Sequence, residues 1–232
     1  VHSAELEKIV VGELLHVSVA GIGEWQVRAV NFSHLGLHLE FAEQSAAGEK
    51  LAAKLAAIRD ENMEYIERAI EASQRVALAL TEAVNSGALT REELFDNRYV
   101  PIKGTDPQQF TTRYLSALEK ILPAIQEPLL ACDPRMIFCA AVDRNGYLGV
   151  HNTIYSQQQR PGDLAYNTAR SRNRRIFDDR AGLSAARNVR PYLIQNYPRD
   201  MGNGIVILMQ EIDAPVRVFG KHWGGFRTAY KS

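Results

Sequence analysis

Short runs that alternate apolar and polar residues open the chain. Residues 8–43 contain several of them, and Gly36–Phe41 alternates strictly. A period of two places successive side chains on opposite faces of a strand. The pattern therefore predicts a small β unit over residues 1–45.

A different period begins at Ala46. Apolar residues then recur every three or four positions as far as Val84. This spacing predicts a helix of about 35 residues, with a break near residues 60–62. Gly87 supplies a C-terminal stop. We interpret 46–89 as a connector or dimerisation helix that projects from its domain; two helices folding back on the core are the alternative.

Shorter helices are expected next. Thr90 and Glu93 have the spacing of a capping box. Asp106 followed by Pro107 predicts another helix start, and apolar residues at intervals of three and four continue that helix to Leu129. Two prolines inside this second helix should kink or end it.

The remaining chain alternates between strand and loop signals. The apolar run 136–142 and the Asn145-Gly146 pair predict a hairpin with a type I′ turn, whose second strand spans 147–152. A polar crossover over 156–191 leads to a three-stranded antiparallel meander. Together these elements predict an α+β fold with about five antiparallel strands over 90–232.

The bulk composition narrows the class of function. Lysine plus arginine number 27, as do aspartate plus glutamate, so no net charge attracts a nucleic acid or an anionic membrane surface. Cys132 and Cys139 are expected to be reduced, mostly buried thiols. No apolar run reaches the roughly 18 residues of a membrane helix. No phosphate loop, nucleophile elbow or zinc-protease motif occurs. We therefore expect a soluble binding domain that is not an enzyme and has no cofactor.

Several uncommon motifs occur in one order over residues 60–231. They resemble, segment by segment, the C-terminal cytoplasmic PAS-like or Cache-like sensory domain of proteobacterial methyl-accepting chemotaxis proteins. The motifs are Leu94-Phe-Asp-Asn-Arg-Tyr-Val-Pro101, Asp143-Arg-Asn-Gly146, Asn173-Arg-Arg-Ile-Phe-Asp-Asp-Arg180, Tyr197-Pro-Arg-Asp200-Met-Gly202 and Gly220-Lys-His-Trp-Gly-Gly225.

This resemblance implies a five-stranded PAS-like sheet with a pocket between the sheet and the crossover. It implies a cytoplasmic signal-input domain that binds a small polar or anionic ligand, and a long helix that dimerises or leads to a signalling module in the same full-length chain. Chemoreceptors of this kind signal by shifting between two helix arrangements. Two alternatives stay open: a haem or redox sensor of the same fold, and a ligand-free dimerisation module.

Arginine supplies the first candidate ligand contacts. The crossover has many arginines and few acids, and a guanidinium holds carboxylate or phosphate through two parallel hydrogen bonds. Arg190 is the strongest candidate because it begins a predicted strand. Structural ion pairs with nearby aspartates are the competing interpretation. The candidates are Arg172, Arg174, Arg175, Arg187 and Arg190.

Three ring side chains are further candidates. His151 ends the second hairpin strand, and His222 precedes Trp223 in the last turn. Imidazole binds haem iron, a metal ion or the polar edge of a ligand. No two histidines have metal-ligand spacing, so we expect no metal site. A turn-capping His151 and a core-filling Trp223 are the competing interpretations, and Asp143 with Asn145 is expected to form a turn rather than to catalyse.

The N-terminal unit carries a second, weaker resemblance. Asn31-Phe-Ser33-His-Leu-Gly36 resembles the second signature of PilZ domains, which bind cyclic di-GMP. The arginine pair that this family places upstream has no counterpart, since no arginine precedes Arg28. We therefore expect a PilZ-like fragment or look-alike without nucleotide affinity.

Overall fold

The computed structural model describes residues 14–19, 23–33, 36–41, 53, 57, 60–200 and 204–231. The chain divides into two compact units, Val1–Met63 and Glu64–Ser232, and each is described by itself. The first unit contains three antiparallel strands in the order β1-β2-β3, as the alternating pattern predicts. Residues 34 and 35 of the PilZ-like motif lie outside the described residues, so that interpretation stays a prediction. The strands are β1 (Leu14–Val19), β2 (Gly23–Ser33) and β3 (Gly36–Phe41).

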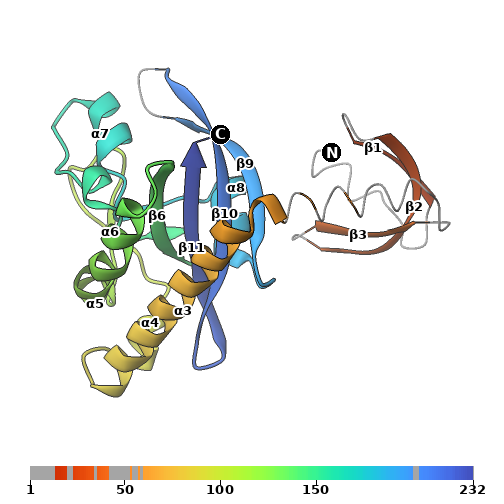
Figure 1. Cartoon of the computed structure of the whole chain (residues 1–232). Coiled ribbons are helices and arrows are strands. Elements are labelled where there is room, and N and C mark those ends of the chain that lie inside the picture. Colours follow the sequence, from red (N-terminus) through yellow and green to blue (C-terminus); the bar gives the residue numbers. More distant parts are fainter. Residues whose placement is uncertain are drawn as a thin grey trace. The chain divides into compact units, whose positions relative to one another are not determined.

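The long helix α3 packs against the sheet of the second unit (Figure 1). It spans Met63–Asn85 and follows a turn at Asn62, close to the predicted break. The second unit begins at Glu64, within the segment predicted as a connector, which favours a helix folded onto the core. Gly87, with a φ of 77°, lies just beyond the helix end. The earlier part of the predicted helix, apart from residues 53, 57 and 60–62, lies outside the described residues. The buried side chains recur at helical spacing: Ile66, Ala69, Ala72, Ser73, Val76 and Leu80.

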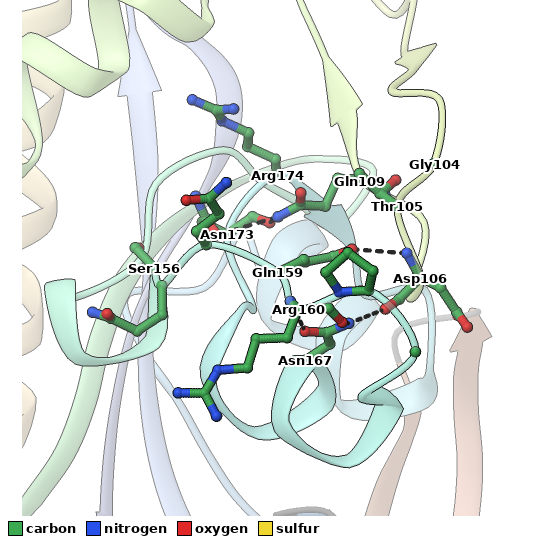
Figure 2. Close-up of a pocket in the computed structure, with 14 residues that line it drawn as sticks. Gly104, Thr105, Asp106, Gln109, Ser156, Gln159, Arg160, Asn167, Asn173 and Arg174 are labelled. Atoms are coloured by element: carbon green, nitrogen blue, oxygen red, sulfur yellow. Dashed lines mark hydrogen bonds between the residues drawn. The ribbon is translucent and has the colours of Figure 1, made fainter.

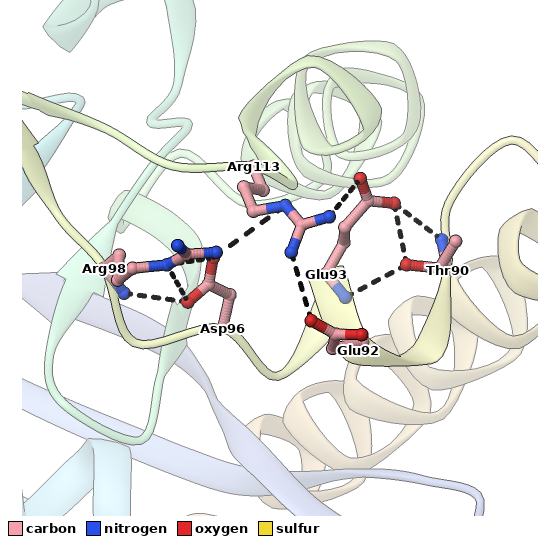
Figure 3. A network of polar contacts seen from close by, with 6 residues as sticks. All are labelled: Thr90, Glu92, Glu93, Asp96, Arg98 and Arg113. Atoms are coloured by element: carbon pink, nitrogen blue, oxygen red, sulfur yellow. Dashed lines mark hydrogen bonds and ion pairs between the residues drawn. The ribbon is translucent and has the colours of Figure 1, made fainter.

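A capping box and an ion-pair network hold the segment after α3 (Figure 3). Helix α4, Arg91–Leu94, has the predicted box: the Thr90 hydroxyl accepts from the Glu93 N–H, and the Glu93 carboxylate accepts from the Thr90 N–H. Arg113 pairs with Glu93 at 3.0 Å and lies 3.9 Å from Asp96. These pairs are partly exposed, so each contributes little alone. As a network they tie α4 to the chain that enters the next helices.

The helix start predicted at Asp106 was wrong, whereas the helical pattern predicted as far as Leu129 is confirmed from Leu115 onward, with a break at Pro123. The Thr105 hydroxyl accepts from the Gln109 N–H, and the Gln109 C=O accepts from the Ile102 N–H. These bonds use the backbone groups of Gln109 in a loop that closes a two-stranded ladder. Pro123 occupies the first position of α6, where its missing N–H costs nothing. The elements are β4 (Val100–Pro101), β5 (Phe110–Thr111), α5 (Leu115–Ile121) and α6 (Pro123–Ala131).

Four long antiparallel strands form the main sheet in the order β6-β11-β10-β9. Strands β9, β10 and β11 form the predicted meander. Phe219 and Gly220 turn the chain between β10 and β11 with φ values of 52° and 74°, both positive as a type I′ turn requires. Residues 221–225, predicted as part of the turn, therefore belong to β11. The strands are β6 (Met136–Asp143), β9 (Leu193–Asp200), β10 (Val206–Val218) and β11 (Lys221–Lys231).

The turn after β6 differs from the predicted type I′ hairpin. The Asp143 C=O accepts from the Gly146 N–H, but neither central residue, Arg144 or Asn145, has a positive φ. The Asp143 carboxylate fixes this turn by accepting from the N–H groups of Asn145 and Tyr147, each at 2.9 Å. The next strand pairs with a strand of the crossover, so the main sheet has four strands rather than five. These paired strands are β7 (Tyr147–Leu148) and β8 (Arg175–Ile176).

The two faces of the sheet are covered by different layers. Phe226 and Tyr230 of β11 pack with α3, α5 and α6, whereas Ala229 packs with the crossover. Helix α8 of the crossover (Arg180–Arg187) lies so close to β11 that a Cβ on Gly225 would lie 2.5 Å from the Ala185 carbonyl oxygen. Only glycine fits there. The crossover elements are η1 (Thr153–Tyr155), α7 (Leu164–Arg170) and α8 (Arg180–Arg187).

Two sequence expectations concern single features of the described chain. Both cysteines are free, but Cys132 is exposed and only Cys139 is buried, so the prediction of two buried thiols was half wrong. Over the described ranges, no helix has the length and apolarity needed to cross a bilayer.

Candidate functional site

A cavity of about 40 Å³ lies between the sheet and the crossover of the second unit. Three arginines reach it from three elements: Arg172 from the crossover, Arg199 from β9 and Arg227 from β11. We call it the buried cationic cavity. The rest of its wall is Phe138, Leu148, His151, Phe177, Asp179 and Tyr197.

Arg199 is buried without a hydrogen-bond partner. It is 2% exposed, and its Nε, Nη1 and Nη2 atoms have no acceptor among the residues that the structure describes. Its Cζ lies 4.5 Å from the centre of the Phe138 ring and 4.6 Å from that of Tyr155. These cation–π contacts offset part of the cost of burying the charge. Burial lowers the pKa of Arg199. A buried cation with three unpaired donor nitrogens is costly, so an acceptor in the cavity would stabilise the protein.

Arg227, in contrast, is paired. Its Nε and Nη2 donate to the two carboxylate oxygens of Glu211 at 2.8 and 2.9 Å, and both residues are buried. Nearby, Gln195 Nε2 donates to Asp213 Oδ2 at 2.9 Å. Burial, and then the neighbouring Glu211 charge, raises the pKa of Asp213 well above its ordinary value, which favours its neutral form. The Glu211 carboxylate is thus the one that pairs with the Arg227 guanidinium.

Arg172 and His151 complete the polar wall. Burial, and then the Arg199 charge, lowers the pKa of Arg172 to about 9, so it remains charged at neutral pH. Burial, and then Arg199, also lowers the pKa of His151, so the imidazole is neutral. His151 Nδ1 accepts from the Asn152 N–H at 2.8 Å, which places the imidazole proton on Nε2. His151 therefore offers a donor, as the arginines do.

Positive charge predominates around the cavity. Its three guanidiniums lie near two carboxylates: Glu211, which pairs with Arg227, and the exposed Asp179, which is the acid of the lining. Such a site attracts an anion and repels a metal ion. No cluster of three His, Cys, Asp or Glu suited to a metal occurs in the part of the chain that the structure describes. About 40 Å³ is room for roughly three waters, and a haem macrocycle does not fit.

A larger hollow, of about 410 Å³, opens on the surface of the same unit (Figure 2). We call it the surface pocket. The side chain of Gln159 ties its two main walls together, because Oε1 accepts from the Asp106 N–H and Nε2 donates to the C=O of the following proline, each at 2.8 Å. Asn167 Nδ2 also donates to the Asp106 C=O at 2.8 Å. The walls are residues 104–106, Gln109, 156–162, Asn167, Asn173 and Arg174.

The two hollows share one segment of the crossover as a wall. Arg172 lines the buried cationic cavity, whereas Asn173 and Arg174 line the surface pocket. Ser171, just before them, pairs with Ser156 in an isolated β-bridge. The Arg172 N–H donates to the C=O of Tyr155, the residue whose ring covers Arg199, at 2.7 Å. Two candidate contacts, Arg172 and His151, thus meet at the cavity, and Arg174 lies at the other hollow.

The remaining candidate arginines line neither of these hollows. The Arg175 Cζ lies 5.1 Å from the Phe177 ring centre. Arg187 and Arg190 are exposed. Strand β9 begins at Leu193, so the argument that Arg190 begins a strand was wrong.

The ring candidates other than His151 have structural roles. His222 Nε2 lies 2.8 Å from the Ala186 carbonyl oxygen, which joins β11 to α8. Trp223 Nε1 donates to the Leu94 C=O at 3.1 Å, and its ring is buried in the core. The interpretation of Trp223 as a core residue is confirmed.

Two of the three cavity arginines were missed from the sequence. Arg199 and Arg227 lie in strands rather than in the crossover. The sequence pattern that could have identified them is a charged residue within an otherwise apolar strand. Glu211 and Asp213 flank buried Ile212 on β10, and Arg227 lies among apolar residues on β11. Opposite charges at inward positions of adjacent strands indicate a buried pair, and a further cation beside them indicates a site.

No family model matches this sequence, and no curated protein matches it. The resemblance to chemoreceptor sensory domains therefore depends on the sequence motifs alone. The geometry of the two hollows gives a separate argument that the second unit binds ligands.

Proposed function

We propose that the second unit is the signal-input domain of a chemotaxis receptor and that it binds a small anion in the buried cationic cavity. The central observation is Arg199, whose buried guanidinium has no hydrogen-bond partner and lines a cavity shared with Arg172 and His151. Carboxylate and phosphate groups satisfy guanidinium donors in pairs. The cavity lies between an antiparallel sheet and the crossover, where the PAS-like or Cache-like resemblance places a ligand.

Strand β11 offers a route from the cavity to α3. Arg227 lines the cavity, and Tyr230 of the same strand points to the opposite face. The Tyr230 ring packs on Tyr65 of α3, with ring centres 4.3 Å apart. Arg68 of α3 also pairs with Asp133, just before β6, at 3.0 Å. An anion bound to Arg199 lies beside Arg227, so it alters the packing of β11 against the cavity and changes the balance between two positions of α3.

Thermal denaturation with a panel of small anions tests the binding step. Formate, acetate, nitrate, sulfate and phosphate are compared with chloride at constant ionic strength. At least one should raise the melting temperature saturably, and Arg199→Gln should abolish that rise. Arg190→Gln is the matched control, because Arg190 is exposed and lines neither hollow. A panel without saturable stabilisation, or stabilisation that persists in Arg199→Gln, contradicts the proposal.

Hydrogen exchange tests the signalling step. The anion that stabilises the protein should change amide protection in α3 as well as in β9 and β11, because local opening reports coupled elements. If amide protection changes only in the walls of the buried cationic cavity, the domain binds an anion but does not transmit the binding event through α3.

A further inference from the structure

We propose that the surface pocket is a second ligand site, and that it binds an uncharged, hydroxyl-rich molecule such as a sugar or polyol. Its volume of about 410 Å³ lies within the range of roughly 300–1,000 Å³ that is usual for small-molecule sites. The buried cationic cavity, at about 40 Å³, has no room for such a molecule. The two hollows therefore differ in the class of ligand that each accepts.

The frame of the surface pocket is already fixed. Gln159 and Asn167 hold the 104–109 loop and the 156–162 loop together through hydrogen bonds to backbone groups (Figure 2). Asn167 Oδ1 also accepts from the Arg160 N–H at 2.7 Å. A hollow whose walls are tied in this way loses little conformational entropy when a ligand enters.

The lining favours hydroxyl groups over charged groups. Side-chain amides predominate, and each amide offers both donors and an acceptor, as a sugar hydroxyl does. Each guanidinium of the wall already lies beside a carboxylate. Arg174 Nη2 pairs with Glu119 at 2.7 Å, and Arg160 lies 4.0 Å from Asp163 and 3.6 Å from the centre of the Tyr166 ring. An anionic ligand would have to compete with these carboxylates, whereas a neutral hydroxyl can accept from the unpaired Arg174 Nε without displacing them.

Two glutamines of the rim allow a clean test. Gln157 and Gln158 line the pocket and are exposed, so their replacement by alanine leaves the core and the ties between the two loops intact and removes only the local bond from Gln157 Nε2 to the Thr153 C=O, at 2.7 Å. The wild-type protein is titrated calorimetrically with glucose, ribose, myo-inositol, glycerol and trehalose, and with charged gluconate and glucosamine. We expect at least one neutral compound to bind saturably, and Gln157→Ala/Gln158→Ala to weaken that binding by about tenfold, since two hydrogen bonds are lost.

Matched controls make the result decisive. Gln74→Ala removes an exposed glutamine from α3 and should leave affinity unchanged. Arg199→Gln should also leave it unchanged, which separates this site from the proposed anion receptor. The inference is overturned if no neutral compound binds saturably, if the double variant binds as tightly as the wild type, or if gluconate or glucosamine binds more tightly than glucose.

Discussion

The two hollows of the second unit differ in how far their polar groups are satisfied. In the surface pocket, of about 410 Å³, the amides of Gln159 and Asn167 already hydrogen-bond the backbone that they face. In the buried cationic cavity, of about 40 Å³, Arg199 has no acceptor within the described part of the chain. Volume therefore measures how much a site can hold, whereas unmet donors measure how strongly it requires an occupant. The buried cationic cavity, although smaller, therefore has the greater need of a bound acceptor.

The largest effect should come from breaking the neutralised pair of the buried cationic cavity. Arg227→Met leaves Glu211 buried and unpaired, so the free energy of unfolding should fall by about 3–5 kcal/mol in urea denaturation. The double variant Arg227→Met/Glu211→Leu removes both charges and should recover most of that loss. A double variant as unstable as Arg227→Met would show that packing, and not charge pairing, holds this wall.

Removing the buried guanidinium of Arg199 should instead increase the free energy of unfolding. Arg199→Met keeps an unbranched side chain against Phe138 and Tyr155 but removes the buried charge. In a low-salt zwitterionic buffer, the free energy of unfolding should rise by about 1–3 kcal/mol. Arg190→Met, on the exposed surface, should change it by less than about 0.5 kcal/mol. A loss of stability in Arg199→Met would mean that the ring contacts already stabilise the charge, and the contrast between the hollows would weaken.

His151 should make stability depend on pH. Burial lowers the pKa of His151 well below 6.5 in the folded protein, whereas the unfolded chain takes up this proton near 6.5. Below that pH the unfolded state binds more protons, so stability decreases as the pH falls. Between about pH 6.5 and about pH 5, His151→Gln should flatten this slope by up to about 1.4 kcal/mol per pH unit. Denaturant titrations at each pH measure it, and equal slopes for the two proteins would show that folding does not lower the pKa of His151.

The smallest expected effect lies at the surface pocket. Gln159→Ala removes two ties between the loops and should lower the free energy of unfolding by about 1–2 kcal/mol, with weaker binding of any ligand held there. Gln158→Ala, a neighbour without such ties, should stay within about 0.5 kcal/mol of the wild type. If both variants behave alike, the loops are held by something other than the side chain of Gln159.

Local signals predicted much of the fold. The spacing of apolar residues in α3, the Thr90 and Glu93 box and the meander all depend on residues close in sequence, and all three formed. The helix start at Asp106 failed because Thr105 and Ile102 offered the backbone of Gln109 other partners. The path of the loop decides whether the backbone of Gln109 bonds within a helix or to these residues. A capping pattern in the sequence carries no information on that path.

The site was less predictable than the fold. Arg172 and His151 were identified because the crossover and the hairpin were recognised as the places where a pocket forms. Arg199 and Arg227 were missed because the face to which a strand residue points depends on strand register. Arg190 was overvalued for a related reason, since it precedes β9 and faces solvent.

The crossover wall between the two hollows has a consequence for what a receptor of this design reports. Arg172 faces one compartment and its next two neighbours face the other, along a stretch held by the Ser156–Ser171 bridge. If both hollows bind ligands as proposed, an occupant that displaces this stretch from one side would change the affinity of the opposite side, and thermodynamic reciprocity would make the two factors equal. Such a domain would respond to a combination of two chemicals rather than to the concentration of one.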